Sequence, residues 1–294
     1  MMKLQVSHWT DYELIDTGDG EKLERFGPYI IRRPEPQAIW PRALSADEWE
    51  KRADAAFVRS KGSAESGSWI KKPGMKDPWF CEYKSENLHL RYKLALSSFK
   101  HVGIFPEQSA NWEHLSSELR RIAKASGEVP RLLNLFAYTG LASLAARQAG
   151  AQVTHVDAVR QVNAWAKDNM EASGLEGIRW LTDDALKFVR REERRNNTYH
   201  CILLDPPAYG RGPDGEKWLL EENLGELLEA CSRILEPENN YVLLNLYSMG
   251  YSDCIAENLC KAYFPHASLS SGELHFCDSF GRKLPLGIFS RRSG

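Results

Sequence analysis

The sequence lacks any run of apolar residues long enough to cross a bilayer, which would need roughly 20 of them. Its apolar runs, such as the one from Cys201 to Leu204, have the length of a β-strand. The amino terminus turns polar by the seventh residue and so offers no apolar core of the kind found in signal peptides. These absences predict a cytoplasmic protein without a membrane span.

The sequence also lacks any Cys-x-x-Cys pair, and the spacing of its six cysteines is not typical of a zinc site or a disulfide framework. Several of them lie within apolar strand or helix patterns, where cysteine usually acts as a small buried side chain. We therefore predict reduced, structural cysteines and no bound metal. The six are Cys81, Cys201, Cys231, Cys254, Cys260 and Cys277.

A third absence is an excess of positive charge, since the formal net charge is −2. Nucleic-acid-binding proteins usually carry a basic surface, so a polyanionic partner would have to be met by a local patch. With 43% hydrophobic and 27% charged residues, the composition is that of an ordinary globular protein. A length of 294 residues allows one large domain or two of unequal size.

The sequence pattern of residues 1–87 predicts a small α+β domain, mainly of β-structure, with an accessory or substrate-binding role. Its short alternating segments are separated by turn clusters. One helix is predicted from Ala46 to Arg59, because Ser45 and Glu48 form a capping box at its start. The predicted strands are 12–15, 29–31 and 79–83.

Residues 88–130 are expected to connect this domain to a second one and to contribute to its ligand pocket. Over residues 131–294 strands and helices alternate, which argues for a mostly parallel sheet covered on both faces. The prediction is an α/β, Rossmann-like domain with a sheet of about seven strands, the last two antiparallel. The strands are expected at 132–136, 152–156, 179–182, 201–204, 241–246, 269–276 and 284–289, and the helices at 141–148, 160–172, around 188–189 and at 218–235.

Ligands of open α/β sheets bind outside the carboxyl ends of the strands, and the first such end carries the turn Phe136-Ala137-Tyr138-Thr139-Gly140. A dinucleotide site would need several glycines there, because the backbone must approach a pyrophosphate. Only Gly140 is present, and Tyr138 and Thr139 would crowd the phosphates. We therefore expect a cofactor without phosphates, whose carboxylate lies at the amino terminus of the following helix.

Carboxylates follow the next two strands. Asp157 stands where an acidic side chain accepts hydrogen bonds from ribose hydroxyls, although an Asp at this position also caps helices. Asp183 and Asp184, followed by Ala185, stand where a carboxylate could accept a hydrogen bond from an adenine amino group. Taken alone, this second pair is more typical of a helix cap. Together the two strand ends predict a nucleoside site.

The most specific segment, Asp205-Pro206-Pro207-Ala208-Tyr209, follows the fourth strand. Two adjacent prolines fix the backbone and remove two N–H donors, so nearby carbonyls are expected to point outward as acceptors. Asp205 adds an acceptor and Tyr209 a flat face, which together suit a planar ring that carries an amino group. A simple turn would explain the prolines alone, but not the whole segment directly after a buried strand.

These four strand ends resemble those of class I S-adenosylmethionine-dependent methyltransferases. The similarity is greatest to the branch related to the bacterial large-subunit ribosomal RNA (cytosine-C5) methyltransferases. It covers roughly residues 88–292 and includes a segment that in this branch precedes the domain and lies over the cofactor, His101 to Gln108. The other matching stretches are 132–140, 154–157, 180–188 and 205–212.

The resemblance implies S-adenosyl-L-methionine as the cofactor and S-adenosyl-L-homocysteine as the product. It implies that Asp157 holds the ribose, that Asp184 holds the adenine and that the segment starting at Asp205 holds the methyl acceptor. The expected cofactor-binding residues are Phe105, Gln108, Phe136, Tyr138, Thr139, Gly140, Asp157, Asp183, Asp184 and Ala185. The expected catalytic residues are Asp205, Pro206, Pro207 and Tyr209.

Two departures from that branch bear on the acceptor. The small RNA-binding domain with which those enzymes commonly begin has no counterpart at the start of this chain. Carbon-5 transfer also needs a cysteine thiolate that adds to the pyrimidine ring, and the family places this cysteine after the fifth strand. Here the position reads Leu246-Tyr247-Ser248-Met249-Gly250, and Cys254 comes several residues later. Transfer to nitrogen is therefore expected.

The sequence thus predicts methyl transfer to a nucleobase in RNA, with ribosomal RNA favoured. Basic residues of the first domain are candidates for steering the nucleic acid and its tryptophans for stacking, although core packing is the stronger alternative for the tryptophans. Two other interpretations are a methyltransferase of a small molecule or protein side chain and, more remotely, an NAD-dependent dehydrogenase. The basic candidates are Arg32, Arg33, Lys71, Lys72 and Lys76.

Overall fold

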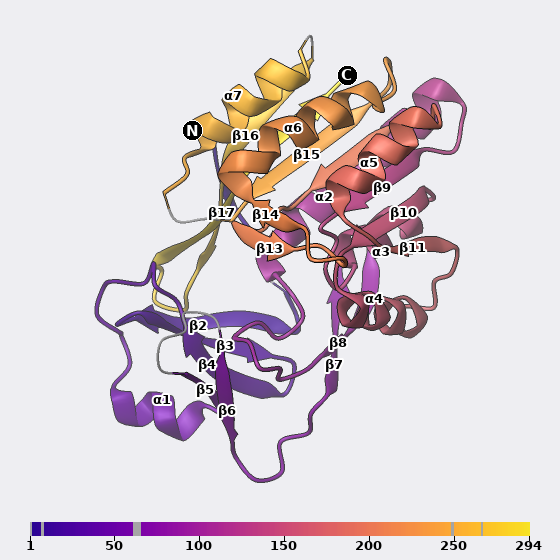
Figure 1. Cartoon of the computed structure of the whole chain (residues 1–294). Helices are drawn as coiled ribbons and strands as arrows, with labels where there is room; N and C mark the ends of the chain where they lie inside the picture. Colours follow the sequence, from indigo (N-terminus) through magenta and orange to yellow (C-terminus); the bar gives the residue numbers. More distant parts are fainter. Residues whose placement is uncertain (1, 7–8, 61–65, 248–249, 266) are drawn as a thin grey trace. The chain divides into compact units, whose positions relative to one another are not determined.

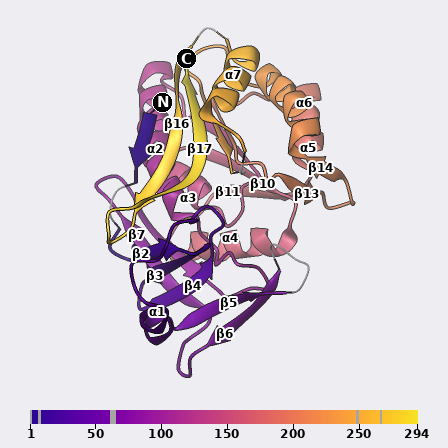
Figure 2. The same cartoon turned by 90° about the vertical axis from the view of Figure 1, so that its left-hand side faces the viewer.

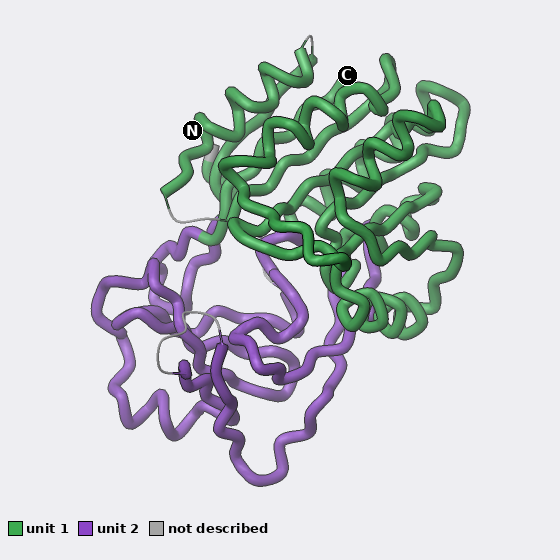
Figure 3. The backbone as a smooth tube through the Cα atoms, in the orientation of Figure 1, with its two compact units in different colours: residues 1–4, 110–274, 286–294 green, residues 5–109, 275–285 purple. Residues whose placement is uncertain are grey.

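The computed structural model describes all residues except 1, 7–8, 61–65, 248–249 and 266. The chain forms two compact units, which are coloured separately in Figure 3. Unit 1 comprises Met1–Leu4, Ala110–Leu274 and Leu286–Gly294, and unit 2 comprises Gln5–Ser109 and His275–Pro285. The division after Ser109 falls inside the segment 88–130 that the sequence predicts to be a connector, so its extended part belongs to unit 2 and its helical part to unit 1.

A large mixed sheet forms the centre of unit 1 (Figure 1). Its strands are β1 (Met2–Gln5), β9 (Arg131–Leu135), β10 (Gln152–Asp157), β11 (Ile178–Thr182), β12 (Cys201–Leu204), β15 (Tyr241–Leu246), β16 (Ser268–Cys277) and β17 (Lys283–Ser293). Among the described residues these eight strands run in the order β1-β16-β17-β15-β12-β9-β10-β11. The β9, β10, β11, β12 and β15 pairings are parallel, and β17 runs antiparallel to β15.

This topology confirms the predicted Rossmann-like α/β fold, with β1 as an additional strand. The β1 segment lies next to β16 at the edge of the sheet. A strand this short has no clear signal of its own in the sequence, because its stability comes from pairing with its neighbour rather than from local propensity.

Helices cover both faces of the sheet, with α5, α6 and α7 side by side on one face and α2 and α3 on the other (Figure 2). The helices of this unit are α2 (Ser109–Ser126), α3 (Leu141–Gln148), α4 (Arg160–Ala172), α5 (Ala185–Arg194), α6 (Leu220–Arg233) and α7 (Asp253–Tyr263). The α7 helix has no counterpart among the predicted ones. The α6 helix begins at Leu220 rather than at Trp218, because residues Lys217–Leu219 form β14, which pairs with β13 (Tyr209–Arg211).

Buried apolar side chains join the strands of unit 1 to the helices of one face. Leu135, Leu204 and Leu244 come from neighbouring strands and belong to one cluster with Phe188 of α5 and Leu227 of α6. All five are fully buried. Burying a side chain of this size stabilises a fold by about 1.5–3 kcal/mol. The core thus fixes the strands whose ends carry the polar residues described below.

The strand order reverses between β9 and β12, which is the point at which ligands of such sheets bind. In the parallel register, Leu135 at the end of β9 lies beside Val156 of β10 and beside Leu204 at the end of β12. The turn after β9, the Asp157 that ends β10, and Asp205 after β12 therefore meet at one edge of the sheet.

Unit 2 contains a five-stranded sheet in the order β2-β3-β4-β5-β6 and a two-stranded sheet of β7 and β8. The strands are β2 (Tyr12–Gly18), β3 (Glu21–Phe26), β4 (Tyr29–Pro34), β5 (Ala55–Arg59), β6 (Gly67–Lys71), β7 (Trp79–Lys84) and β8 (His89–Leu94). The predicted capping box is present: the Glu48 backbone N–H donates to Ser45 Oγ (3.3 Å), and the Ser45 N–H donates to the Glu48 carboxylate (2.9 Å). It starts α1 (Ala46–Arg52).

The predicted helix from Ala46 to Arg59 is too long. Residues 55–59 form β5 instead, in which Ala55 and Phe57 are buried and Val58 is exposed, and which pairs with β6. An alternating, β-branched and aromatic segment suits a strand once a partner is available. The helix therefore ends at Arg52.

Most of the cysteines and of the tryptophans of unit 2 are packed in the interior, as expected for residues with a structural role. All six cysteines are free, and four of them are buried. Trp9, Trp49 and Trp79 are buried in unit 2, and Trp40 and Trp69 are half-buried, so core packing accounts for most of these rings. In the part of the chain that the structure describes, no helix is both long and apolar enough to span a membrane.

Candidate active site

The turn after β9 adopts an unusual backbone conformation. Phe136 and Tyr138 have positive φ angles of 55° and 50°, and Gly140 has a φ of 86°. A positive φ at a residue other than glycine costs on the order of 1–3 kcal/mol and is typical of functional sites. The Ala137 N–H donates to the Val156 carbonyl (3.2 Å), which holds the turn against β10.

Gly140 is required where the turn enters α3. A Cβ built at this position would lie 3.0 Å from the Cβ of Ala166 in α4, and the φ of +86° is itself unfavourable for any other residue. The glycine therefore allows the start of α3 to approach α4 closely. Binding of a cofactor carboxylate by the N–H groups at the start of α3 stays a prediction.

Asp157 is held in place by two backbone N–H groups. Tyr138 N–H donates to Oδ2 of Asp157 (2.9 Å), and Val159 N–H donates to Oδ1 (2.9 Å). Burial raises the pKa of this carboxyl group, and the two N–H donors oppose that rise. Each oxygen has a second lone pair, so the carboxylate retains the capacity to accept bonds from two hydroxyls. Through its bond with Val159, Asp157 also stabilises the start of α4, and helix capping was the alternative role considered for this residue.

The residues after β11 mainly stabilise the start of α5. Asp184 is the N-cap of α5 and accepts a hydrogen bond from the Lys187 N–H (2.9 Å). Asp183 forms an ion pair with Arg191, and its N–H donates to the Asp157 carbonyl (3.2 Å). The helix-capping alternative is therefore realised for Asp184, and its contact with adenine stays a prediction. Ala185, the first residue of α5, is buried.

Asn163 of α4 helps to hold the strand ends of the candidate site, and the sequence did not predict this role. Its buried side-chain Nδ2 lies 3.1 Å from the carbonyls of Asp157 and Leu181 and 2.9 Å from Thr182 Oγ1. It thus ties the end of β10 to the end of β11. The one indication in the sequence was an amide on the same side of an amphipathic helix as the buried Ala166.

A buried polar chain runs beneath these strand ends. Asn134 Nδ2 donates to Ser143 Oγ (2.9 Å), and Ser143 Oγ lies 3.0 Å from His155 Nδ1. Burial lowers the pKa of His155 to about 3, so the imidazole is neutral. Its ring packs against Trp180 at a centroid distance of 4.5 Å. The chain therefore supports the site but supplies no charge to it.

Asp205 is exceptional because no described residue donates a hydrogen bond to its carboxylate or forms an ion pair with it. It follows β12 directly and is only partly accessible to solvent. Burial alone raises its pKa to about 6. A carboxylate with unused acceptor capacity at a ligand-binding edge is a candidate for a reacting group.

Two carbonyls after Asp205 accept hydrogen bonds within the chain, which corrects the expectation that the carbonyls near the prolines point outward as acceptors. Trp218 Nε1 donates to the Pro207 carbonyl (2.7 Å), and the Leu220 N–H donates to the Ala208 carbonyl (3.0 Å). Trp218 is buried and also packs on Phe136, with the ring centroids 4.8 Å apart. The indole thus joins the acceptor segment to the turn after β9.

Tyr209 begins β13 and lies opposite Leu219 in the hairpin of β13 and β14. Its side chain is 57% exposed, and among the described residues its hydroxyl has no hydrogen-bond partner. The exposed ring is available for stacking against a planar ligand, as the sequence predicts. Pro206, by contrast, is buried.

Phe105 and Gln108 fall in unit 2, where Phe105 precedes the short 3-10 helix Pro106–Gln108 and Gln108 ends it. Their contact with the cofactor stays a prediction. In the same unit, Arg32 and Arg33 form ion pairs with Glu21 and Glu24, so these two cations are already neutralised. Within the described ranges, no group of three or more His, Cys, Asp and Glu side chains could hold a metal ion.

The fold is matched by solved structures. A crystal structure of an S-adenosylmethionine-dependent methyltransferase from Agrobacterium tumefaciens has a TM-score of 0.90 and 37% identity, over 100% of this chain and 93% of that one. A second structure, of a protein assigned as a methyltransferase and complexed with S-adenosylhomocysteine, has a TM-score of 0.72 at 17% identity, over 97% and 76% of the two chains. At that identity the second likeness shows the fold alone.

Among curated proteins, the ribosomal RNA large subunit methyltransferase K/L of Shewanella amazonensis is 30% identical over 209 residues. The match covers 70% of this chain but 27% of that protein. The chain spans about a quarter of the length of the curated relatives it matches. No model of a known protein family matches it.

The Agrobacterium structure is matched over nearly its whole length, which removes the dehydrogenase interpretation and confirms the resemblance inferred from the strand ends. The chain therefore belongs to the S-adenosylmethionine-dependent methyltransferases, and it is related in sequence to methyltransferases of ribosomal RNA.

Proposed function

We propose that this enzyme methylates a nucleobase nitrogen in RNA, with ribosomal RNA as the favoured substrate. The observation that carries the proposal is the Asp205 carboxylate, which has no donor among the described residues and precedes the exposed Tyr209 by four residues in the chain. A carboxylate acceptor next to a stacking face suits a flat ring with an amino group. A base within a paired stem would have to be flipped out to reach it.

The residues of the other strand ends fit the cofactor. Asp157 has unused lone pairs for the ribose hydroxyls, and the start of α3 offers N–H groups to the carboxylate of the methionine moiety. Asp183, Asp184 and Ala185 would lie at the adenine. S-adenosylmethionine, when bound, supplies a methyl group on a sulfonium, and a neutral thioether is the leaving group.

The chain's own residues then have two tasks. Tyr209 and the proline-stiffened backbone hold the acceptor ring in line with the methyl group, because positioning supplies much of the rate in such a transfer. Asp205 would accept a hydrogen bond from the acceptor N–H and would take that proton when the nitrogen gains the methyl group that S-adenosylmethionine supplies. A carboxylate with a pKa of about 6 is mainly ionised at neutral pH and is basic enough for this step.

The absence of a suitable thiol supports nitrogen over carbon-5 as the methylated atom. The residues after β15 include Tyr247 and Gly250, while Ser248 and Met249 lie outside the described residues. Cys254 is exposed in the first turn of α7. Since carbon-5 of a pyrimidine is not nucleophilic before a thiolate adds to the ring, this arrangement disfavours that chemistry.

The proposed RNA substrate rests on the relatives named as ribosomal RNA methyltransferases. One observation favours the second candidate, a small-molecule or protein acceptor: the net charge is −2, and Arg32 and Arg33 are paired with acidic residues. A substrate with many phosphates usually meets a basic surface.

Mass spectrometry of nucleosides tests the proposal directly. RNA from cells that lack the protein should lose one N-methylated nucleoside, and the wild-type chain should restore it. Asp205→Asn should not restore it, whereas Asp214→Asn should, because Asp214 is exposed in the turn between β13 and β14. An unchanged set of methylated nucleosides in total RNA would refute RNA as the substrate and leave the second candidate.

A further inference from the structure

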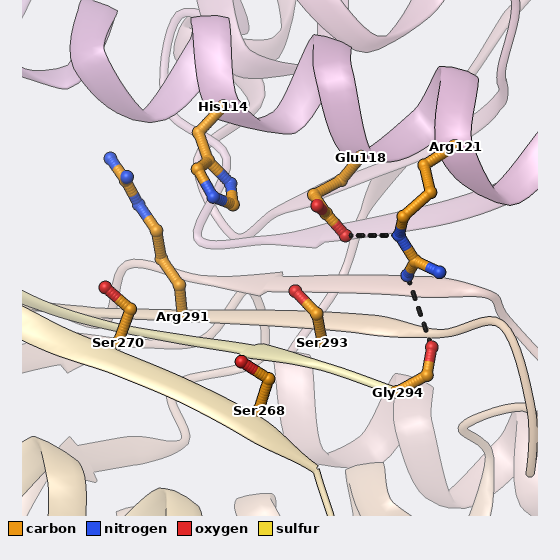
Figure 4. Close-up of a pocket in the computed structure, with 8 residues that line it drawn as sticks. All are labelled: His114, Glu118, Arg121, Ser268, Ser270, Arg291, Ser293 and Gly294. Carbon is orange, nitrogen blue, oxygen red and sulfur yellow. Dashed lines mark hydrogen bonds and ion pairs between the residues drawn. The ribbon is translucent and has the colours of Figure 1, made fainter.

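A polar pocket in unit 1 lies between α2 and the last two strands, β16 and β17 (Figure 4). Its volume is about 400 Å³. It contains none of the residues assigned above to the cofactor or the acceptor. The lining residues are His114, Glu118, Arg121, Ser268, Ser270, Arg291, Ser293 and Gly294.

Arg291 is a buried cation without an acidic partner. Its Nε and Nη2 donate to Asn111 Oδ1 (3.0 and 2.6 Å), and Nη2 also donates to the Ala110 carbonyl (3.0 Å). Asn111 is fixed in turn by a 2.9 Å bond to Asn245. All of these acceptors are neutral, and among the described residues Nη1 has no acceptor. The side chain is 6% exposed, and its guanidinium lies over the Phe289 ring at 4.5 Å, so its charge has an aromatic neighbour but no carboxylate partner among the described residues.

The other two charged side chains that line the pocket pair with each other. Arg121 Nε donates to the Glu118 carboxylate (3.0 Å), and its Nη2 donates to the Gly294 carbonyl (3.2 Å), as the dashed lines in Figure 4 show. This pair contributes no net charge, and so the positive charge of Arg291 remains. A buried, unpaired cation is unfavourable unless an anion accompanies it.

His114 and three serines add neutral donors to the same space. Ser268 and Ser270 alternate along β16, and Figure 4 shows their hydroxyls and that of Ser293 pointing toward α2. His114 stacks on Tyr241 with the centroids 5.5 Å apart, and its Nδ1 is buried without a partner among the described residues. Burial and the charge of Arg291 lower the pKa of His114, and the charge of Glu118 opposes that change.

We propose that this pocket binds a phosphate group, held by Arg291, the serine hydroxyls and His114. A tetrahedral oxyanion offers several acceptor oxygens to donors that converge from different elements, and a guanidinium binds it through charge-assisted hydrogen bonds. The volume leaves room for the remainder of a phosphorylated ligand. The source of the phosphate is either the free ion, a nucleotide or an RNA strand.

The response of His114 to phosphate provides the first test on the unmodified protein. Its imidazole resonances are followed by NMR during a pH titration in phosphate and in chloride at equal ionic strength, with His114→Gln to assign them. A bound phosphate should raise the pKa of His114, because its negative charge stabilises the imidazolium. An identical pKa in the two salts would overturn the proposal.

Neighbouring arginines of β17 supply a matched pair of variants for the second test. Arg292 is as buried as Arg291 (7% against 6% exposed), but its Nε and Nη2 donate to Phe264 and Pro265 carbonyls and Nη1 to Asn240, away from the pocket. In calorimetry with inorganic phosphate, Arg291→Gln should bind at least roughly tenfold more weakly than the wild type. Arg292→Gln should bind with unchanged affinity. Equal affinities in both variants would refute the site.

Ser270→Ala provides a milder variant in case loss of the arginine prevents folding, and it should weaken phosphate binding by a few fold. Adenosine monophosphate and an RNA trinucleotide, tested with saturating S-adenosylhomocysteine to occupy the cofactor site, distinguish the sources. Tighter binding of either ligand than of inorganic phosphate identifies that source, provided Arg291→Gln weakens it. A phosphate affinity that is unchanged in both Arg291→Gln and Ser270→Ala would show that phosphate binds elsewhere.

Discussion

Asp157 and Asp205 occupy equivalent places, directly at the carboxyl ends of two parallel strands, yet their surroundings are opposite. Asp157 accepts hydrogen bonds from two backbone N–H groups, which fix the orientation of its carboxylate. No described residue donates to Asp205, and burial raises its pKa to about 6. The comparison suggests a division of labour in which the fixed carboxylate binds and the unpaired one reacts.

The largest expected effect is on turnover. Asp205→Ala should reduce kcat by about 10²- to 10⁴-fold, the usual contribution of a proton acceptor. Affinity for S-adenosylhomocysteine should stay within about twofold, because the carboxylate is assigned to the acceptor and not to the cofactor. Calorimetry and single-turnover methylation measure the two quantities. If this variant lost cofactor affinity and kept its rate, the division between the two carboxylates would be reversed.

Asp157→Ala should have the converse effect. Loss of hydrogen bonds to the ribose and of the anchor for Tyr138 should weaken S-adenosylhomocysteine by roughly tenfold to a hundredfold. Asp157→Asn, which keeps one carbonyl acceptor, should be less affected. Circular dichroism verifies that both variants are folded, and Asp214→Asn serves as a control. Wild-type affinity in the Ala variant would remove the binding role.

Tyr209→Ala sharpens the comparison on the acceptor side. Stacking on an aromatic ring contributes about 1–3 kcal/mol per base, so KM for the acceptor should rise by roughly tenfold. Cofactor affinity should not change, and Tyr209→Phe should behave as wild type because the hydroxyl has no partner among the described residues. Unaltered acceptor kinetics in Tyr209→Ala would dismiss the stacking.

The smallest expected effect is on stability and has the opposite sign. Since the folded-state pKa of Asp205 is raised to about 6, the unfolded chain binds fewer protons between pH 4 and 6, and stability falls as pH rises through this range. The full pKa difference corresponds to about 3 kcal/mol at pH 7, and because the carboxyl group is partly accessible to solvent we expect Asp205→Asn to stabilise the protein by only about 1 kcal/mol. Urea denaturation at pH 4 and pH 7 checks this, and a destabilised variant at pH 7 would indicate that the carboxylate is paired after all.

Much of unit 1 could be predicted from the sequence because its signals are local. Buried strands followed by polar residues and helices predicted both the sheet and the edge at which the candidate site lies. In unit 2, Ser45 with Glu48 likewise predicted the start of α1. The register of parallel strands then brings Asp157 and Asp205 to that edge without further information.

The missed features depend on contacts between distant segments. The sequence around Phe57 is compatible with a helix, and it becomes a strand because β6 pairs with it. The Pro207 carbonyl appeared available, and it is bonded to Trp218, eleven residues later. The role of Asn163 depends on three acceptors from two different strands, which no local pattern reveals.

The double contact of Trp218 has a thermodynamic consequence. Its indole N–H donates to the Pro207 carbonyl while its ring packs on Phe136, so the segment proposed to hold the acceptor and the turn proposed to hold the cofactor share one side chain. Binding at one end then biases the conformation of the other, and linkage requires the effect to be reciprocal. We expect S-adenosylhomocysteine to change acceptor affinity and Trp218→Phe, which lacks the N–H, to reduce that coupling. If S-adenosylhomocysteine and the acceptor bound independently of each other in the wild type, Trp218 would not couple the two sites.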